Sequence, residues 1–234
     1  MLEALLAEKK LQKVYLQFGQ RGKVIDEIKT LAKKQGVLVQ EVPNEKFRKL
    51  TSVENAQGIA ALESSDSMIE PQKLLAYSKA HSQLLIALDM VQDTQNVGAI
   101  IRTVACAGAD GVVVTKHNSA PINDTVSKIS AGGLQAIKVS QVVNLAQFIE
   151  TAKKEGFFVI GSELNPKAKP YTKADYIGPI LLVVGNEEAG IRQLTSKNCD
   201  ELVYIPMPGK LQSLNVSVAT GILLYEALKQ RHKQ

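Results

Sequence analysis

The sequence predicts an α/β protein built on a mostly parallel sheet with helices on both faces. From about residue 84 onwards, short apolar runs that fit buried strands alternate with longer segments of helical periodicity. The runs at 84–88 and 180–184 contain only apolar residues, which is typical of strands that are covered on both faces. A shorter pattern of strands and helices precedes them, so we expect a second, smaller α/β domain.

The first 66 residues are expected to form this small α/β domain. Apolar residues between Val24 and Ala32 recur at helical spacing, and Gly36 ends the predicted helix at 24–35. The remaining pattern predicts strands at 14–18, 37–42 and 58–62 and a short helix at 44–50. The stretch 64–71 is polar, rich in serine and closed by Pro71, which indicates a linker. We therefore predict a small domain at 1–66, a linker at 67–78 and a larger domain at 79–234.

The larger domain is expected to alternate between strands and helices. Strands are predicted at 84–88, 112–115, 136–139, 157–161, 180–184 and 202–205. Helices are predicted at 96–109, 124–131, 144–155, 189–196 and 213–230, the third with Asn144 as its N-cap. A long polar loop is expected at 163–178. In open parallel α/β sheets, ligands bind beyond the carboxyl ends of the strands, so we look there for a site.

Composition and charge limit the classes of function. With 45% hydrophobic residues, the 234-residue chain can form a proper core. The formal net charge of +5 is compatible with RNA or DNA as a partner, but a solvated basic surface explains it equally well. Cys106 and Cys199 have no metal-ligand spacing, so we expect neither a disulfide framework nor a metal site. No apolar run reaches the roughly 20 residues of a membrane span and no leader pattern is present, so we expect a cytoplasmic protein outside the membrane.

Three loops with unusual residues follow predicted strands. One, at 93–98, leads into a helix that carries Arg102, and the second, at 185–190, reads Gly-Asn-Glu-Glu-Ala-Gly. The third, at 206–215, begins Pro-Met-Pro-Gly, which cannot be regular secondary structure because proline lacks an amide donor and glycine permits unusual φ. We expect the three loops to meet at one edge of the sheet and to form one functional site.

Each candidate residue also has a purely structural explanation. Asn96 and Ser213 would suit helix N-caps, and Asn215 would suit a polar position in a first helical turn. Arg102 is typical of a surface ion pair, and Glu187 of an acid that faces a helix dipole. We favour a shared site, because otherwise each of the three loops would need its own unrelated structural reason for these residues.

Motifs of several other enzyme classes are absent from the sequence. It contains no GxGxxG dinucleotide fingerprint, no GxxxxGK[ST] phosphate loop and no GxSxG nucleophile elbow. His81, His117 and His232 fall outside the three loops, so we do not expect a Ser-His-Asp mechanism.

The three loops carry motifs that resemble those of the SpoU family, RNA ribose 2′-O-methyltransferases of the SPOUT superfamily. The motifs read Asp93-x-x-Asn96-x-Gly98-Ala99-x-x-Arg102-Thr103, then Gly185-Asn186-Glu187-x-x-Gly190, then Ile205-Pro206-Met207 with Ser213-Leu214-Asn215-Val216-Ser217-Val218-Ala219. They occur in the order and spacing of the family over about residues 84–231. Residues 55–61, NAQGIAA, resemble the ribosomal-protein-like RNA-binding domain that is joined to this catalytic domain. The two-domain layout and residues 199–202 most resemble the bacterial 23S rRNA guanosine 2′-O-methyltransferases.

The resemblance implies a fold feature, a cofactor and partners that the pattern of residues alone does not indicate. It implies a trefoil knot, in which the C-terminal helix is threaded through a loop of the chain. It also implies S-adenosylmethionine as cofactor, RNA as substrate and a homodimer with the site near the interface. By motif match, the cofactor would be lined by Gly185, Ile205, Met207, Gly209 and Leu214, largely through backbone groups.

The resemblance also implies catalytic roles for five residues. Arg102 would hold phosphate and the 2′-oxygen; since a guanidinium normally stays protonated, we prefer this role to that of the base that takes the hydroxyl proton. Asn96 would position Arg102 or the ribose, Glu187 would order the loops, and Ser213 and Asn215 would hold the knot and the target nucleotide. A sulfonium is a good leaving group, so no metal is expected. The alternatives are a tRNA ribose 2′-O-methyltransferase and a non-enzymatic RNA-binding protein on the same scaffold.

Overall fold

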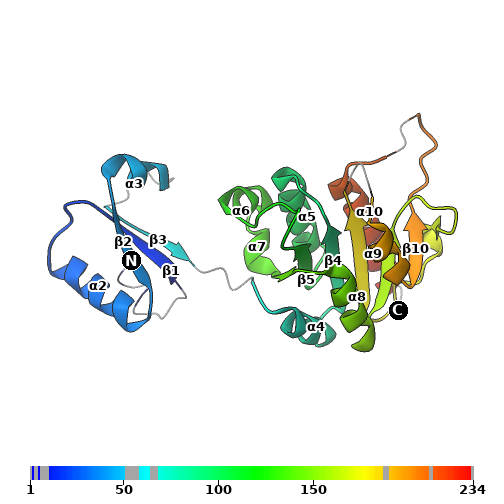
Figure 1. Cartoon of the computed structure of the whole chain (residues 1–234), viewed down its shortest axis with the longest axis horizontal. Helices are drawn as coiled ribbons and strands as arrows, with labels where there is room; N and C mark the ends of the chain where they lie inside the picture. Colours follow the sequence, from blue (N-terminus) through cyan, green and yellow to red (C-terminus); the bar gives the residue numbers. More distant parts are fainter. Residues whose placement is uncertain are drawn as a thin grey trace. The chain divides into compact units, whose positions relative to one another are not determined.

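Figure 1 shows the computed structural model, which describes residues 2, 5, 11–50, 58–63, 68–186, 190–210 and 213–232. Contacts divide the chain into two compact units, Met1–Asp66 and Ser67–Gln234. Residues 55–57 and 64–67, which contain part of the RNA-binding resemblance and of the expected linker, lie outside the described residues. Glu187, a predicted catalytic residue, lies outside them as well.

The N-terminal unit is a three-stranded sheet with helices. Its elements are β1 (Leu11–Gln17), α2 (Lys23–Lys34), β2 (Leu38–Val42), α3 (Asn44–Leu50) and β3 (Ile59–Glu63). The strand order is β2-β1-β3, with β2 parallel and β3 antiparallel to β1. Val14 and Leu16 of β1 pack against Ile25, Ile28 and Ala32, the buried stripe of α2. All five predicted elements of this unit are confirmed, with boundaries that shift by at most three residues.

The second unit is built on a seven-stranded sheet in the order β6-β5-β4-β9-β7-β10-β8. Every strand pairing that the structure describes in this sheet is parallel, so the predicted parallel α/β fold is confirmed. The strands are β4 (Leu84–Asp89), β5 (Gly111–Thr115), β6 (Lys138–Val142), β7 (Phe158–Ser162), β8 (Lys169–Pro170), β9 (Ile180–Gly185) and β10 (Glu201–Tyr204).

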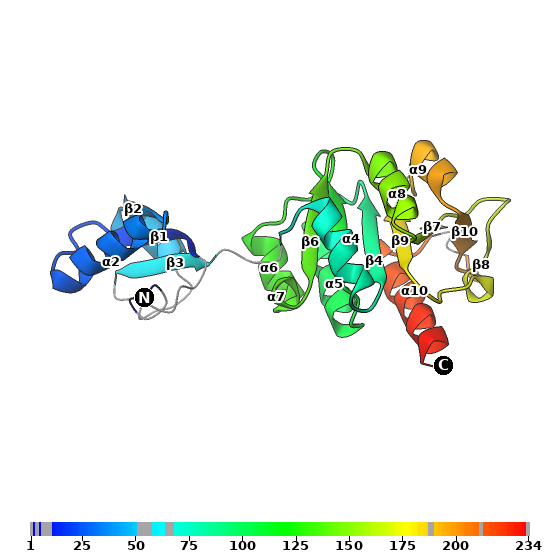
Figure 2. The ribbon, with the colours of Figure 1, turned by 90° about the horizontal axis from the view of Figure 1, so that it is seen from below.

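Helices cover both faces of this sheet (Figures 1 and 2). They are α4 (Pro71–Lys79), α5 (Thr94–Cys106), α6 (Asp124–Ser130), α7 (Gly133–Ala136), α8 (Leu145–Lys154), α9 (Gln193–Asn198) and α10 (Val216–Arg231). On β4, Leu84, Ile86 and Leu88 belong to one buried cluster, with apolar residues of α5 and α10. The alternate residues Leu85 and Ala87 belong to a second cluster, with residues of α4 and α8. This alternation explains why the strand is apolar along its whole length.

Two predictions about connecting segments were wrong. The range 67–78, expected to be a linker, contains most of α4, which has Pro71 at its start and buries Leu74 and Leu75. Proline at the first helical position loses no helical hydrogen bond, so Pro71 starts the helix instead of ending a linker. The loop expected at 163–178 contains β8 and the 3-10 turn Tyr171–Lys173, and Tyr176 is fully buried there with its hydroxyl donating to the Tyr171 carbonyl at 3.0 Å.

The starts of three helices and one strand differ from the prediction. Helix α5 begins at Thr94 with Asp93 as N-cap, whose side chain accepts from the Gln95 amide at 2.8 Å, so Asn96 lies inside the helix. Helix α10 begins at Val216 with Asn215, and not Ser213, as N-cap. Helix α9 starts only at Gln193, because Gly190 bonds to Asn186 and the Arg192 amide donates to Asp89 of β4. Strand β6 starts after the short helix α7. Asn144 is confirmed as the N-cap of α8.

Candidate active site

A cavity of about 310 Å³ opens at the carboxyl ends of β7, β9 and β10, beside the start of α10. The chain adds β5 and β6 on one side of β4, whereas β9, β7 and β10 lie on the other side. Ligands of open α/β sheets bind at such a change in strand order, because the loops diverge there and leave a crevice. The cavity is lined by Ser162, Glu163, Leu164, Val184, Gly185, Asn186, Gly190, Tyr204, Ile205, Met207, Ser213, Leu214, Val216 and Ala219.

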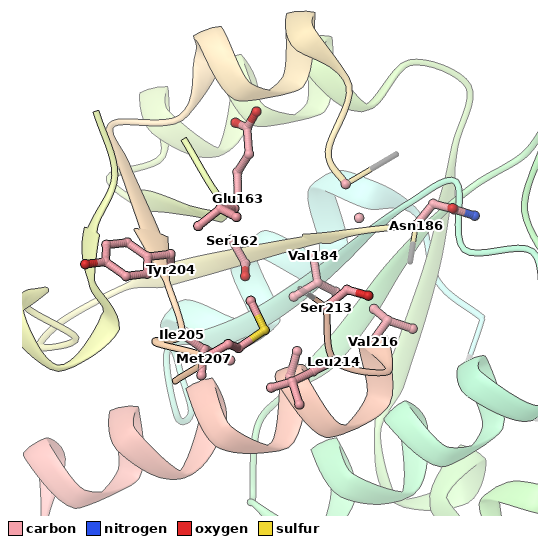
Figure 3. A pocket seen from close by; sticks show the side chains of 14 residues that line it. Ser162, Glu163, Val184, Asn186, Tyr204, Ile205, Met207, Ser213, Leu214 and Val216 are labelled. Carbon is pink, nitrogen blue, oxygen red and sulfur yellow. The ribbon is translucent and has the colours of Figure 1, made fainter. Parts of the chain in front are cut away.

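Four of the five predicted cofactor residues line this cavity, namely Gly185, Ile205, Met207 and Leu214. Figure 3 shows Met207 and Leu214 together between strand β9 and helix α10. The fifth, Gly209, is exposed and lies outside the lining residues. The loops after β9 and β10 therefore meet as expected.

Gly185 and Gly190 make a tight loop after β9. The backbones of Asn186 and Gly190 bond to each other in both directions, at 3.1 and 2.8 Å. A Cβ atom on Gly185 would lie only 2.1 Å from the Gly190 carbonyl group, which is far inside van der Waals contact. Only glycine fits at 185, so the shape of this cavity wall depends on it.

The cavity also contains polar residues that the sequence reading did not single out. Ser162 ends β7, Glu163 follows it, and Tyr204 ends β10. The Glu163 carboxylate accepts a hydrogen bond from the Ser196 hydroxyl at 2.5 Å, and its backbone amide donates to the Val203 carbonyl at 2.9 Å. The sequence could have indicated Ser162 and Glu163 by their position at the end of a buried strand, because ligands bind at the carboxyl ends of parallel strands.

Asn96 and Asn215, two predicted catalytic residues, contact each other directly. The Asn215 Nδ2 donates to the Asn96 Oδ1 at 2.8 Å, which joins α5 to the start of α10. The Asn215 Oδ1 accepts from both the amide and the hydroxyl of Ser217, at 2.9 and 2.6 Å. The first and third loops are thus joined through their asparagines, and Ser213 lines the neighbouring cavity.

Arg102 is exposed on α5, next to its buried stripe of Val97, Ile101 and Val104. The backbone of α7 packs closely here, since a Cβ on Gly133 would lie 3.2 Å from the Arg102 Cα. Within the described residues, Arg102 makes no hydrogen bond or ion pair. Its guanidinium is therefore open to a ligand.

In the described part of the chain, none of the helices is long and apolar enough to cross a membrane. No group of three or more His, Cys, Asp or Glu side chains among these residues could hold a metal ion.

Comparison with known proteins identifies both units. Residues 83–225 match the model of the SpoU rRNA Methylase family, and residues 1–65 match the model for RNA 2′-O ribose methyltransferase substrate binding. The 23S rRNA (guanosine-2′-O-)-methyltransferase RlmB of Acinetobacter baylyi is 40% identical over 215 residues, covering 91% of this chain and 87% of that protein.

Solved structures agree with these matches. An AdoMet-bound rRNA methyltransferase from Sinorhizobium meliloti superimposes with a TM-score of 0.71 and 27% identity, over 100% of this chain and 84% of that one. The A. aeolicus TrmH/SpoU tRNA modifying enzyme gives a TM-score of 0.61 and 32% identity, over 70% of this chain and 83% of that one. The family expected from the three motifs is confirmed: this chain belongs to the SpoU rRNA methylase family.

Proposed function

We propose that this protein transfers the methyl group of S-adenosylmethionine to a ribose 2′-hydroxyl of RNA, and that its substrate is a guanosine of 23S rRNA. The observation that carries the proposal is the cavity at the carboxyl edge of the sheet, lined by motif residues of the family. Family membership fixes the enzyme class, an RNA 2′-O-methyltransferase that uses S-adenosylmethionine. The relative named for 23S rRNA guanosine, at 40% identity, supports the choice of substrate.

The residues of the cavity fit S-adenosylmethionine. Its volume of about 310 Å³ lies at the lower end of the roughly 300–1,000 Å³ that is usual for small-molecule sites. Ile205, Met207 and Leu214 offer apolar side chains to an adenine ring, and Glu163 offers a carboxylate to an ammonium or hydroxyl group. The cofactor supplies an electrophilic methyl group on a sulfonium, which is a good leaving group.

The residues of this chain position the ribose and stabilise charge. Arg102, exposed and unpaired within the described residues, holds an RNA phosphate and the developing 2′-oxyanion. Because its guanidinium stays protonated, the hydroxyl proton leaves to phosphate or water. Asn96 fixes Asn215 and with it the start of α10, and Ser213 faces the cavity. For Glu187, which lies outside the described residues, the role of ordering the loops is implied by the family resemblance.

Helix α10 supports the proposal of a homodimer, whereas the knot is implied by the family resemblance. Val218 and Tyr225 are seven residues apart, on one face of α10, and they are 51% and 54% exposed. Exposed apolar side chains on one face are typical of a subunit interface. We propose that α10 forms the dimer contact and that its start, from Ser213 onwards, is the threaded segment of a trefoil knot.

The N-terminal unit is proposed to bind the RNA outside the target nucleotide. It matches the substrate-binding model of RNA 2′-O ribose methyltransferases. At the carboxyl end of β1, Phe18 is 59% exposed, and Arg21 and Lys23 are exposed in the turn and helix that follow. An exposed aromatic ring beside cations suits an unpaired base and its phosphates. An rRNA substrate places the protein in the cytoplasm, where ribosomes are assembled.

The test is methylation of 23S rRNA by the purified protein with labelled S-adenosylmethionine, followed by mapping of the modified nucleotide. Arg102→Ala should lose most of the activity with its circular dichroism unchanged, and Arg102→Lys should recover only part, because it keeps the charge but not the planar fork. Lys154→Ala, on the opposite face of the sheet, should be fully active. Undiminished turnover by Arg102→Ala would refute the catalytic role.

A tRNA substrate is the second candidate, because the A. aeolicus enzyme at 32% identity is named as tRNA modifying. Competition between 23S rRNA fragments and tRNA in one reaction separates the two substrates. RNA binding without methyl transfer and without S-adenosylmethionine binding would instead identify a non-enzymatic RNA-binding protein.

A further inference from the structure

Asp89 is a fully buried carboxylate at the carboxyl end of β4, in the centre of the sheet. Its Oδ2 accepts from the Arg192 backbone amide at 2.9 Å. Its Oδ1 accepts from Arg192 Nε and Nη2, both at 2.7 Å. A carboxylate without access to water needs such partners, so Arg192 is held in one orientation although 48% of its side chain is exposed.

This pair lies at the exit of the loop that forms one cavity wall. Asp89 stands beside Gly185 in the register of β4 with β9, and Arg192 comes two residues after Gly190. Both Gly185 and Gly190 line the cavity. Arg192 therefore fixes the point at which the loop at 186–190 returns to the sheet.

The start of the same loop is bonded to Met90, the residue that follows β4. The Asn186 Nδ2 donates to the Met90 carbonyl at 3.4 Å. Met90 has a φ of 60°, in the left-handed region that residues with side chains rarely adopt, so the chain turns sharply after Asp89. The start of the loop is thus bonded to Met90, and the segment at its exit is bonded to Asp89.

We propose that Asp89 and Arg192 are a positioning pair that holds Gly185, Asn186 and Gly190, three residues of the cavity wall, in the arrangement that binds S-adenosylmethionine. This inference rests on the proposed function of the cavity. A buried ion pair is poor evidence for stability, since well-packed apolar residues often serve as well, whereas it selects one geometry for the groups that it joins. Here those groups are the cavity wall and strand β4, which leads to the helix α5 that carries Asn96.

The experiment compares S-adenosylmethionine binding and steady-state kinetics in matched variants. Arg192→Ala should raise the Kd and the KM for S-adenosylmethionine roughly 10–100-fold, because a displaced wall loses its contacts with the ligand. The KM for RNA should stay within about twofold. Lys197→Ala removes a cation from the same segment without touching Asp89, and it should leave the Kd and both KM values unchanged.

A second variant covers the case in which the unpaired Asp89 prevents folding. Asp89→Asn combined with Arg192→Met removes both charges, keeps an unbranched stem at position 192 and still loses the guanidinium bonds. Its Kd for S-adenosylmethionine should rise as for Arg192→Ala, with a cooperative unfolding transition retained. A lower unfolding midpoint with an unchanged Kd would mean a merely structural pair and overturn the inference. Failure of the wild type to bind S-adenosylmethionine would instead overturn the proposed function.

Discussion

Asn215 is expected to stabilise the second unit through two contacts that substitution can separate. Its Oδ1 caps α10 by accepting from the Ser217 amide at 2.9 Å, and its Nδ2 donates to Asn96 at 2.8 Å. Asn96 is only 8% exposed, so the second contact is shielded from water. Asn215→Ala removes both contacts, whereas Asn215→Ser keeps a capping hydroxyl but is too short to reach Asn96.

The expected loss follows from these two contacts. An N-cap contributes about 1 kcal/mol, and a hydrogen bond between side chains contributes about 1 kcal/mol. Asn215→Ala should therefore lower the free energy of unfolding by about 2 kcal/mol, which corresponds to about 4–8 °C in Tm for a domain of this size. Asn215→Ser should lose about 1 kcal/mol.

Urea unfolding followed by circular dichroism measures these differences, provided that the slope m is unchanged. A double-mutant cycle of Asn96→Ala with Asn215→Ser should give a coupling energy of about 1 kcal/mol. No coupling would show that the bond between the two asparagines contributes nothing. Equal losses for Asn215→Ser and Asn215→Ala would show that the cap contributes nothing.

Three further predictions concern other parts of the chain. Burial, and next the charge of the adjoining aspartate, raise the pKa of the Cys199 thiol to about 12. Mass spectrometry after iodoacetamide treatment at pH 8 should therefore find label on the exposed Cys106 and none on Cys199 until the protein is unfolded. The pKa of Cys199 in the folded protein lies above the unfolded value of 9.0. The contribution of this thiol to stability is therefore present below pH 9.0 and lost as the pH rises towards 12. Arg231 donates to four backbone carbonyls, and Arg231→Ala should lower the free energy of unfolding in urea by about 2–4 kcal/mol. Lys197→Ala, which removes an exposed cation, should lose less than about 0.5 kcal/mol. Phe18→Ala should raise the KM for RNA about tenfold in the methylation assay through loss of base stacking, with the KM for S-adenosylmethionine unchanged; an unchanged KM for RNA would exclude Phe18 from the RNA interface.

The strands of the second unit were predictable because each is a short apolar run that ends at a polar or glycine residue. The run predicted at 84–88 became Leu84–Asp89, and the run at 180–184 became Ile180–Gly185. Such runs must be buried on both faces, whatever the order of the strands, so composition alone locates them. The order β6-β5-β4-β9-β7-β10-β8 depends on crossovers that no local pattern describes.

Helix starts were less predictable, because several nearby residues can cap a helix. Asp93 and Asn96 both suit an N-cap, as do Ser213 and Asn215. The structure uses Asp93 and Asn215 as caps, and Asn96 lies inside α5, where it accepts from Asn215. That choice is made by contacts between segments more than 100 residues apart, which the sequence does not display.

The same limit applies to the site. The loops after β9 and β10 were expected to meet because parallel strands place their carboxyl ends at one edge, and Met207 and Leu214 do line one cavity with Gly185. The pair of Asp89 and Arg192 was not foreseen, because it exists only where β9 lies directly beside β4. An acidic residue that closes an otherwise apolar strand was the available signal, since its buried charge must have a partner.

Gly185 shows why a motif glycine does not by itself identify a ligand contact. The resemblance to the SpoU family implies that Gly185 lines the cofactor, and Gly185 does line the cavity. Its closest constraint, however, is the Gly190 carbonyl group, 2.1 Å from where a Cβ would stand. Gly185→Ala would therefore displace the loop whether or not a cofactor binds, and a loss of activity would not distinguish the two roles. Met207→Ala and Leu214→Ala are the informative substitutions, because these side chains can be shortened without displacing backbone. If the cavity holds S-adenosylmethionine, both should raise its Kd while the unfolding midpoint of the free protein stays nearly constant.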